Sequence, residues 1–330
     1  MRKVRASMGT LGVLGLELVQ MDTPPTTAYL QIYTVERCRA NCLFCAQASG
    51  SRAEMNRIAR GMYIPADLEA VVSRIKIAFE RGYLARACIQ TALYDMWWED
   101  TICLIKSIRE KSMIPISLSV FPLGDEKYKE LKAVGVNELV IPIDACTPEL
   151  FDRIKGKSTG GPYSWESHTD GIKRASQIFE TVGTHLIIGL GETDEDAVKI
   201  IDDLWKYQIN SALFSYTYIP GAQILLENNK EDIRHYRMVQ LGRYLITQGL
   251  ASYSGMLFSH GDLFDFGLEI DEIMKIIETG IAFQTSGCPD CNRPMANETF
   301  SRIYNFPREP TGNEIEQIKN ELGICYTRKL

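Results

Sequence analysis

Three cysteines stand close together near the start of the chain, in the arrangement Cys38-x₃-Cys42-x₂-Cys45. If the segment wraps around one point, three thiolates at this spacing can all face it. A cuboidal iron–sulfur cluster needs such thiolates, and a set of three leaves one iron open to bind and activate a small molecule. The alternatives are a zinc site or chance clustering, but zinc usually takes four closed ligands and no fourth Cys or His is near in sequence. The spacing therefore predicts an iron–sulfur cluster held by these three residues.

A second pair, Cys288-x₂-Cys291, lies near the end of the chain. In a reduced protein this spacing indicates a metal-ligand pair or a redox dithiol. A dithiol usually has a thioredoxin-like βαβ context, which is missing here, and a zinc knuckle would need two more ligands. We therefore expect an auxiliary iron–sulfur cluster, with Cys325 as the first candidate for its third ligand. The other candidates for that ligand are Cys88, Cys146 and Ser286.

Composition sets the compartment and excludes some partners. Of the 330 residues 45% are hydrophobic and 24% are charged, which is ordinary for a globular protein, and the net charge is −6. A generally basic nucleic-acid surface is not expected, although a local patch is not excluded. Nine cysteines cannot all pair, and a chain of this length needs no disulfides to build a core. We expect a reduced, cytoplasmic protein.

The N-terminus superficially imitates a signal peptide. Residues 1–5 are basic and residues 11–18 are mostly apolar, but this run is short and contains two glycines and a glutamate, with no small-residue cleavage site after it. No other stretch approaches the roughly 18 apolar residues of a membrane span. We expect no membrane association.

Past residue 27 the chain alternates short apolar, β-branched runs with amphipathic, charged segments, which is typical of βα units. The predicted strands cover residues 28–35, 86–91, 116–121, 139–144, 185–190, 212–219, 255–258 and 281–285. The predicted helices cover residues 65–81, 99–111, 126–133, 168–181, 195–207, 233–247 and 271–278.

Eight such units predict an α/β fold, a (β/α)₈ TIM-type barrel that is full or nearly full. The expected division is an N-terminal extension over residues 1–27, a barrel over 28–287 and a C-terminal segment with the second cysteine pair over 288–330. The last two units carry the weakest pattern, so a partial barrel with an appended region stays open. In a closed barrel the first and eighth strands are neighbours, which would put both cysteine groups at the same mouth, where barrel enzymes do their chemistry.

The first cysteine motif, placed directly after the first strand, resembles that of the radical S-adenosylmethionine (SAM) superfamily. Phe44 stands where that family usually keeps an aromatic residue. The resemblance implies a [4Fe-4S] cluster whose open iron chelates the amine and carboxylate of SAM. One electron then cleaves SAM to methionine and a 5′-deoxyadenosyl radical that removes hydrogen from an unactivated carbon. A barrel lumen would shield such a species from water.

Two further segments resemble the biotin synthase branch of this family. Gly189-x-Gly191-Glu192 closes the fifth strand and is similar to a segment whose backbone approaches the adenine, which glycine permits because it has no Cβ. The same glycines also suit an ordinary strand-to-helix turn. Asp144, ending the fourth strand, resembles an aspartate that accepts hydrogen bonds from the ribose hydroxyls, but it would equally suit a helix N-cap.

One departure from the family pattern is visible after the second strand. The usual Gly-Gly-Glu, which holds the methionine amino group, is replaced here by residues 88–91, so Gln90 and Thr91 are the candidates for that task. Ser119, at the end of the third strand, is a candidate to line the same pocket. Biotin synthase also holds an auxiliary cluster with cysteines from inside its barrel, which supports including Cys88 and Cys146 among the candidate ligands.

Within this branch, the segments around Gln90 and around Cys288 resemble biotin synthase-related archaeal proteins, some of which form one half of a two-protein lipoyl synthase. The resemblance implies sulfur insertion into a protein-bound octanoyl chain, with the auxiliary [4Fe-4S] cluster as sulfur source. The implied partners are an octanoylated lipoyl-carrier domain or peptide, a second radical SAM protein and an electron donor of the ferredoxin or flavodoxin type. Two alternatives stay open: another biotin synthase-like enzyme acting on a small molecule, and a non-catalytic iron–sulfur or zinc protein.

Overall fold

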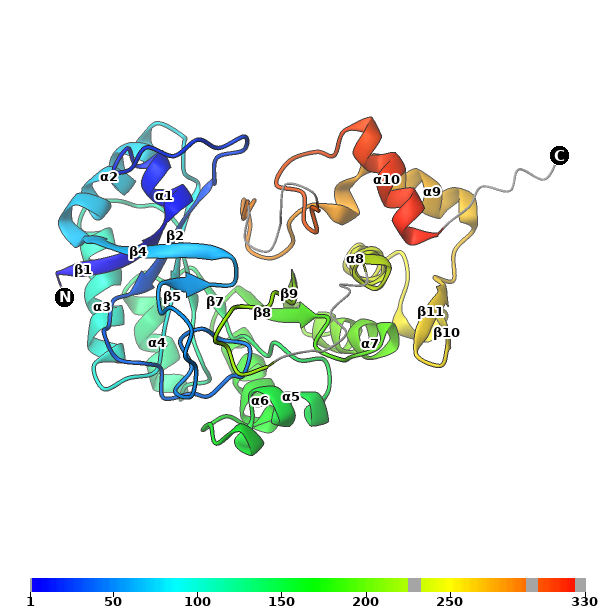
Figure 1. Ribbon diagram of the computed structural model, residues 1–330, viewed down its shortest axis with the longest axis horizontal. Coiled ribbons are helices and arrows are strands. Elements are labelled where there is room, and N and C mark those ends of the chain that lie inside the picture. The colour runs from blue at the N-terminus through cyan, green and yellow to red at the C-terminus, as the bar shows by residue number, and fades with distance from the viewer. Residues whose placement is uncertain (1, 225–232, 295–301, 324–330) are drawn as a thin grey trace.

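Six parallel strands form the centre of the molecule. The computed structural model describes residues 2–224, 233–294 and 302–323. Its main sheet has nine strands in the order β3-β4-β1-β2-β5-β6-β7-β8-β9 (Figure 1). The parallel strands are β2 (Thr27–Ile32), β5 (Arg86–Gln90), β6 (Ile116–Ser119), β7 (Glu138–Val140), β8 (Thr181–Ile188) and β9 (Asn210–Ser215). Most of their residues are buried, as expected for strands covered on both faces.

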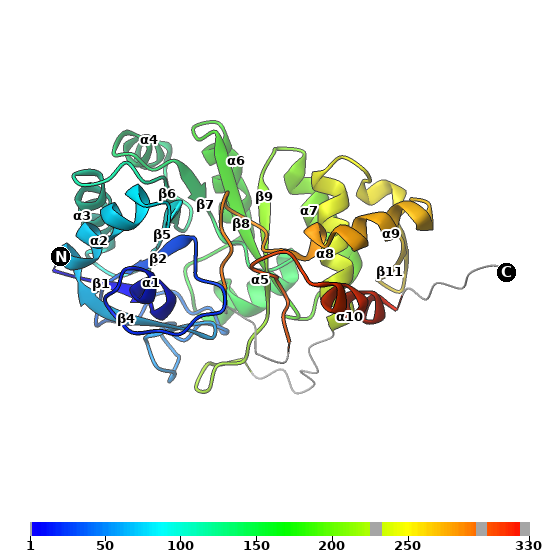
Figure 2. The ribbon, with the colours of Figure 1, turned by 90° about the horizontal axis from the view of Figure 1, so that it is seen from above.

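Helices connect these strands and cover the outer face of the curled sheet (Figures 1 and 2). They are α2 (Leu68–Glu80), α3 (Trp97–Arg109), α4 (Asp125–Ala133), α5 (Pro148–Ile154), α6 (Trp165–Ser176) and α7 (Asp194–Trp205). The α/β, TIM-type barrel fold predicted from the sequence is confirmed, in the form of a partial barrel. The first six predicted strands each overlap one of the parallel strands.

An antiparallel extension precedes and interrupts the first βα unit. Strand β1 (Lys3–Ser7) lies between β2 and β4 (Gly61–Asp67), and β3 (Arg57–Ile58) continues the same edge. Helix α1 (Met8–Val13) follows β1, with Ser7 as its N-cap. The sequence predicted a helix from residue 65, but residues 65–67 belong to β4, because the helix begins only after its N-cap Asp67.

The seventh and eighth predicted strands are not barrel strands. Residues 257–259 form β10 (Leu257–Ser259), which pairs with β11 (Asp262–Asp265) across a two-residue turn, His260 and Gly261, both at positive φ. Such a turn matches the twist of a tight hairpin, so this run pairs with its own neighbour rather than with β9. Residues 281–283 are a 3₁₀ turn that follows the left-handed C-cap Gly280 of α9 (Ile270–Thr279). His260 is exposed in the hairpin turn.

The C-terminal region packs beside the last strand of the sheet. Helices α8 (Ile233–Thr247), α9 and α10 (Gly312–Leu322) share a second apolar core, grouped beyond β9 in Figure 2. Arg237 of α8 is almost fully buried and is held by Glu321 at 2.8 Å and by the carbonyl oxygen of Tyr304 at 2.6 Å. Among the residues described, no helix has the length and hydropathy needed to cross a bilayer.

Candidate active site

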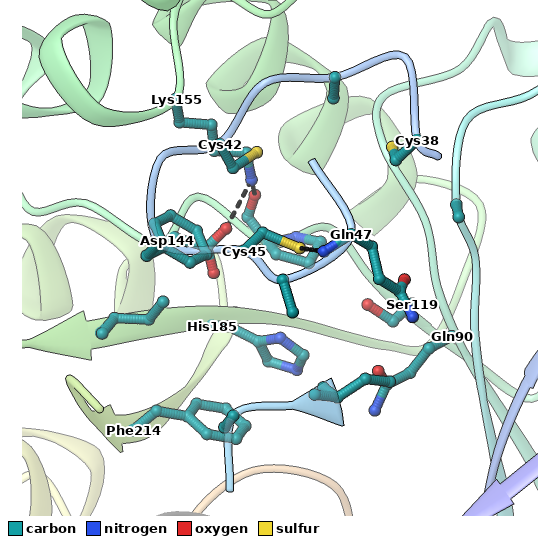
Figure 3. Close-up of a pocket in the computed structure, with 18 of the residues that line it drawn as sticks. Cys38, Cys42, Cys45, Gln47, Gln90, Ser119, Asp144, Lys155, His185 and Phe214 are labelled. Atoms are coloured by element: carbon teal, nitrogen blue, oxygen red, sulfur yellow. Dashed lines mark hydrogen bonds and ion pairs between the residues drawn. The ribbon is translucent and has the colours of Figure 1, made fainter. Parts of the chain in front are cut away.

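The loop that follows β2 presents the first three cysteines to the C-terminal end of the parallel strands (Figure 3). Its shape is held by backbone hydrogen bonds, including Cys38 N to the Gln47 oxygen at 2.9 Å and Cys45 N to the Cys42 oxygen at 2.9 Å. The guanidinium of Arg37 donates to the carbonyl oxygens of Ala46 and Ala53, at 2.8 and 2.9 Å. The loop therefore wraps around one point, as its cysteine spacing requires.

The environment of these sulfur atoms suits a metal cluster. Backbone N–H groups of Leu93 and Gln47 approach Cys38 Sγ at 3.3 Å and Cys45 Sγ at 3.4 Å. Burial raises the pKa of the Cys45 thiol to about 11 and raises the pKa of Cys42 further still. These thiols stay protonated until a metal displaces the proton.

A cavity of about 270 Å³ adjoins the three cysteines. It lies at the carboxyl ends of the strands, where barrel enzymes hold their substrates. Its wall brings together all three cysteines and five of the residues that the sequence proposed for SAM: Phe44, Gln90, Thr91, Ser119 and Asp144. Gln90 and Ser119 are the last residues of β5 and β6 and are paired in register. The side chains expected around SAM thus share one pocket, while their individual roles stay predictions.

Asp144 forms a buried ion pair with a lysine that sequence reasoning missed. Lys155 Nζ lies 2.7 Å from Asp144 Oδ2 and also donates to the Pro142 carbonyl oxygen at 2.5 Å. Asp144 is not a helix N-cap, because Thr147 caps α5 and accepts from Leu150 N. The pocket therefore holds a buried cation and a buried carboxylate beside the Cys42 thiol, an arrangement that suits a ligand carrying both charges.

Two aromatic rings complete the pocket wall below the cysteines. His185 of β8 and Phe214 of β9 lie edge to face, with ring centroids 4.9 Å apart (Figure 3). Burial lowers the pKa of His185 to about 4, so its imidazole is neutral near pH 7. His185 alternates with Ile187 on β8, and this two-residue period is the sequence signal that both side chains face the lumen.

The glycine-rich segment after β8 does not form part of the pocket wall in the part of the chain that the structure describes. Gly189 and Gly191 have φ angles of +100° and +118°, which only glycine adopts readily. The Glu192 carboxylate folds back to accept from the N–H groups of Gly189 and Leu190. The contact to adenine that the resemblance implies for these residues stays a prediction.

His235 of α8 also holds the Glu192 carboxylate by a hydrogen bond. His235 Nε2 lies 3.0 Å from Glu192 Oε1, and its Nδ1 contacts Asp194. Burial lowers the pKa of His235, but the hydrogen bonds that its imidazole donates to the Asp194 and Glu192 carboxylates outweigh this and raise the pKa to about 10. A charged imidazole between two carboxylates therefore fixes the turn that follows β8.

The second cysteine pair lies at the opposite end of the lumen from the first, which corrects the expectation of a shared mouth. Cys291 Sγ lies 3.3 Å from the Tyr29 hydroxyl, in β2. The Pro289 carbonyl oxygen accepts from Arg86, the first residue of β5, and the Gly287 oxygen accepts from Asn210, the first residue of β9. Because residues 281–285 do not form an eighth parallel strand, the following loop turns under the N-terminal ends of the strands. Cys325 lies outside the described residues.

Comparisons with known proteins agree with this geometry. The family model of the radical SAM superfamily matches residues 32–204. Biotin synthases of Persephonella marina and Brachyspira hyodysenteriae are each 24% identical, over 59% and 66% of this chain. The matched segments span 55% and 63% of those enzymes' own lengths.

Solved structures share the fold at low identity. Methylornithine synthase (PylB) superposes with a TM-score of 0.54 at 13% identity, over 68% of this chain and 63% of its own. The hydrogenase maturase HydG from Carboxydothermus hydrogenoformans gives 0.51 at 16%, over 68% and 52%. The chain belongs to the radical SAM superfamily, and within it resembles the biotin synthase branch.

Proposed function

We propose that this radical SAM enzyme inserts sulfur into unactivated C–H bonds of a protein-bound octanoyl chain, as one of two cooperating components that form the lipoyl group. The observation that carries the proposal is the second cysteine pair at the far end of the lumen from the first cysteines. A cluster bound there would hold sulfide toward the interior in which the substrate radical forms. The alternative of a non-catalytic iron–sulfur protein gives no reason for the cavity beside the first three cysteines.

The chain's own side chains fit the first cluster and SAM. Cys38, Cys42 and Cys45 would hold the cluster, and backbone N–H groups already point at two of their sulfur atoms. When bound, the cluster supplies the electron that cleaves SAM into methionine and the hydrogen-abstracting 5′-deoxyadenosyl group. The Lys155 ammonium would pair with the carboxylate of SAM, and Gln90 and Thr91 offer oxygen atoms to its amine.

The rest of the pocket wall would exclude water from the reaction. Phe44, Phe214 and neutral His185 line the cavity with weakly hydrated surface. An octanoyl chain has no functional group that activates its C–H bonds, so binding must hold the reacting carbon in place by apolar contact. Each sulfur inserted would consume one SAM and one electron from a reductant of ferredoxin or flavodoxin type, and the substrate hydrogen would leave on 5′-deoxyadenosine. The new C–S bond would take a sulfide from the second cluster with loss of its Fe–S bonds, and the electron released would pass to the cluster iron.

The test is mass spectrometry of an octanoylated carrier domain or peptide after anaerobic reaction. The chain is reconstituted with iron and sulfide and given SAM and a reductant, with and without a second radical SAM protein. We expect 5′-deoxyadenosine together with a carrier mass increased by one or two sulfur atoms. The variant with Cys38, Cys42 and Cys45 changed to Ala is the control and should give neither product.

Two results would contradict the proposal at different levels. If 5′-deoxyadenosine forms but the carrier mass never changes, octanoyl is not the substrate and the small-molecule alternative is favoured. If the reconstituted chain gives no 5′-deoxyadenosine at all, with any reductant, the radical reaction itself is excluded for this protein.

A further inference from the structure

Cysteines from two distant segments meet at the N-terminal end of the lumen. Cys88 lies on β5 and is paired in register with Tyr29 of β2. The hydroxyl of Tyr29 lies 3.3 Å from Cys291 Sγ, so one tyrosine adjoins both cysteines. The Cys288 thiol is hydrogen-bonded with the Ser117 side chain, and Ser117 of β6 is paired in register with Cys88 of β5. Three thiols thus share one site, although the sequence separates the first from the other two.

The register of the sheet shows which way Cys88 faces. Side chains two residues apart on a strand lie on the same face. Gln90 and Ser119 line the SAM pocket, so Cys88 and Ser117, two residues earlier on β5 and β6, face the same lumen. Tyr29 and Cys88 form a layer one step closer to the N-terminal ends of the strands. Cys88 therefore points into the interior, below the pocket.

The loop that carries Cys288 and Cys291 is fixed at both ends of the partial barrel. Asn292 Oδ1 accepts from Thr26 N at 3.0 Å on the β2 side. On the β9 side, the Ser286 hydroxyl accepts from Leu213 N at 2.9 Å. Gly287 has a φ of +123°, and a Cβ there would meet the Cβ of Ala212 at 2.8 Å. The loop is therefore held against the strands, which positions its two cysteines opposite Cys88.

The surroundings of the three thiols suit a negatively charged cluster. The guanidinium groups of Arg86 and Arg293 lie near Cys88, and Arg86 donates to the neighbouring Ser117 hydroxyl at 3.0 Å, so two cations are available to offset the charge of a cluster. The hydroxyl of Tyr29 accepts from Arg293 N at 2.7 Å and lies 3.3 Å from Cys291 Sγ, so it can donate a hydrogen bond to a metal-bound sulfur there. Ordinary core cysteines lie among apolar side chains, whereas these face cations and hydroxyl donors.

Glu138 adds a carboxylate to this polar layer, and its negative charge near Cys88 and Cys288 is partly offset by Arg86. Its carboxylate lies 3.5 Å from the Arg86 guanidinium and accepts a hydrogen bond from the Ser117 hydroxyl. The side chains of Arg86 and Glu138 are 9% and 3% exposed, so the pair is desolvated and internally balanced. Arg293 stacks on Phe214 of the pocket wall, with 3.9 Å between the guanidinium carbon and the ring centroid.

We propose that Cys88, Cys288 and Cys291 together hold the second iron–sulfur cluster, on the floor of the lumen below the SAM pocket. Cys88 thus takes the place that sequence reasoning gave to Cys325. The ligand set rests on the residues named above, and only the use of the cluster as a sulfur source rests on the proposed function.

The test measures bound iron in a background that lacks the first site. In the full chain with Cys38, Cys42 and Cys45 changed to Ala, anaerobic reconstitution should give one cluster per chain, seen by iron and sulfide content and by EPR after reduction. Adding Cys88→Ala should lower the affinity for that cluster by at least about tenfold, since even outer-shell changes cost this much at metal sites. Cys103→Ala, on α3 and part of neither site, is the matched control and should keep the cluster.

Further variants separate misfolding from loss of a ligand. In the chain with the first site intact, Cys88→Ala should lose about half of its bound iron, and the EPR spectrum of the remaining cluster should still change when SAM is added. Full iron retention in Cys88→Ala would overturn the assignment, as would iron loss in Cys325→Ala or Cys146→Ala alone. Stoichiometric zinc without iron in the triple-Ala background would also overturn it. None of these outcomes depends on sulfur insertion, so the ligand set and the proposed function fail separately.

Discussion

Replacing Lys155 by Met should destabilise the protein even before any cofactor is bound. Lys155 and Asp144 are 2.7 Å apart, and their side chains are only 6% and 11% exposed. Removing one partner of a buried ion pair leaves the other charge without compensation, at a cost of about 3–5 kcal/mol. Because Asp144 lines a cavity that can admit water, we expect a value near the lower end of this range. For a chain of this size, that lowers the thermal unfolding midpoint by about 4 °C.

Denaturant unfolding of the metal-free chain under reducing conditions measures this cost, in a cycle with Asp144→Asn. The double variant should be more stable than Lys155→Met alone, with a coupling energy of at least about 2 kcal/mol. The matched control is Lys199→Met, which removes an ion pair with Asp203 at 2.6 Å whose side chains are 58% and 41% exposed. Such a pair contributes less than about 0.5 kcal/mol. If Lys155→Met behaves like this control, or if the two pocket variants are additive, the ion pair does not organise the pocket.

Two further predictions concern other buried hydrogen bonds. The pKa of His235 is raised to about 10 from an unfolded value near 6.5, so its contribution is complete below pH 6.5 and is lost as pH rises toward 10. Between pH 7 and 9 the wild type should lose roughly 2–3 kcal/mol of unfolding free energy that His235→Gln does not lose, as measured by denaturant midpoints; parallel pH profiles would refute this. Burial raises the pKa of Tyr29, so the wild-type hydroxyl is protonated and can donate a hydrogen bond to Cys291. Tyr29→Phe removes this hydroxyl and leaves every thiol in place. This variant should keep its iron, and the midpoint potential of the second cluster, measured by EPR-monitored redox titration, should become more negative. An unchanged potential would mean that Tyr29 donates no hydrogen bond to the sulfur that holds the cluster.

The parts of the fold that the sequence predicted well depend on local patterns. Most of the six parallel strands coincide with a short apolar run, and the helices that follow them have an apolar face, so a window of about a dozen residues contains the signal. The cysteine loop and Asp144 were likewise found because they follow directly after such runs. Residues 255–258 and 281–285 show the limit, since short apolar runs look alike whether they pair with a barrel strand, form a hairpin or make a 3₁₀ turn.

The residues that sequence reasoning missed act across long distances in the chain. Strand β1 is a five-residue basic segment whose burial depends on β2 and β4 on either side of it. Lys155 reaches Asp144 only because α5 turns back over the end of β7, and His235 reaches Glu192 from a different helix. A single sequence specifies such contacts only through the complete fold, so neither composition nor spacing could reveal them.

The site of Cys88 was partly predictable from a local pattern and partly dependent on the complete fold, and its position constrains the reaction. Its alternation with Gln90 already placed it on the lumen face, but the approach of the 287–293 loop from beneath the strands could not be seen from the sequence. Two residues along a strand correspond to about 6.6 Å, so Cys88 lies one side-chain layer below the pocket residue Gln90. On the proposed function, a substrate carbon between these layers can reach both the hydrogen-abstracting group and the sulfur source without moving between sites. An extended acyl chain that enters along the barrel axis suits this arrangement. Its length then runs across the two layers, and only its width must fit inside the lumen.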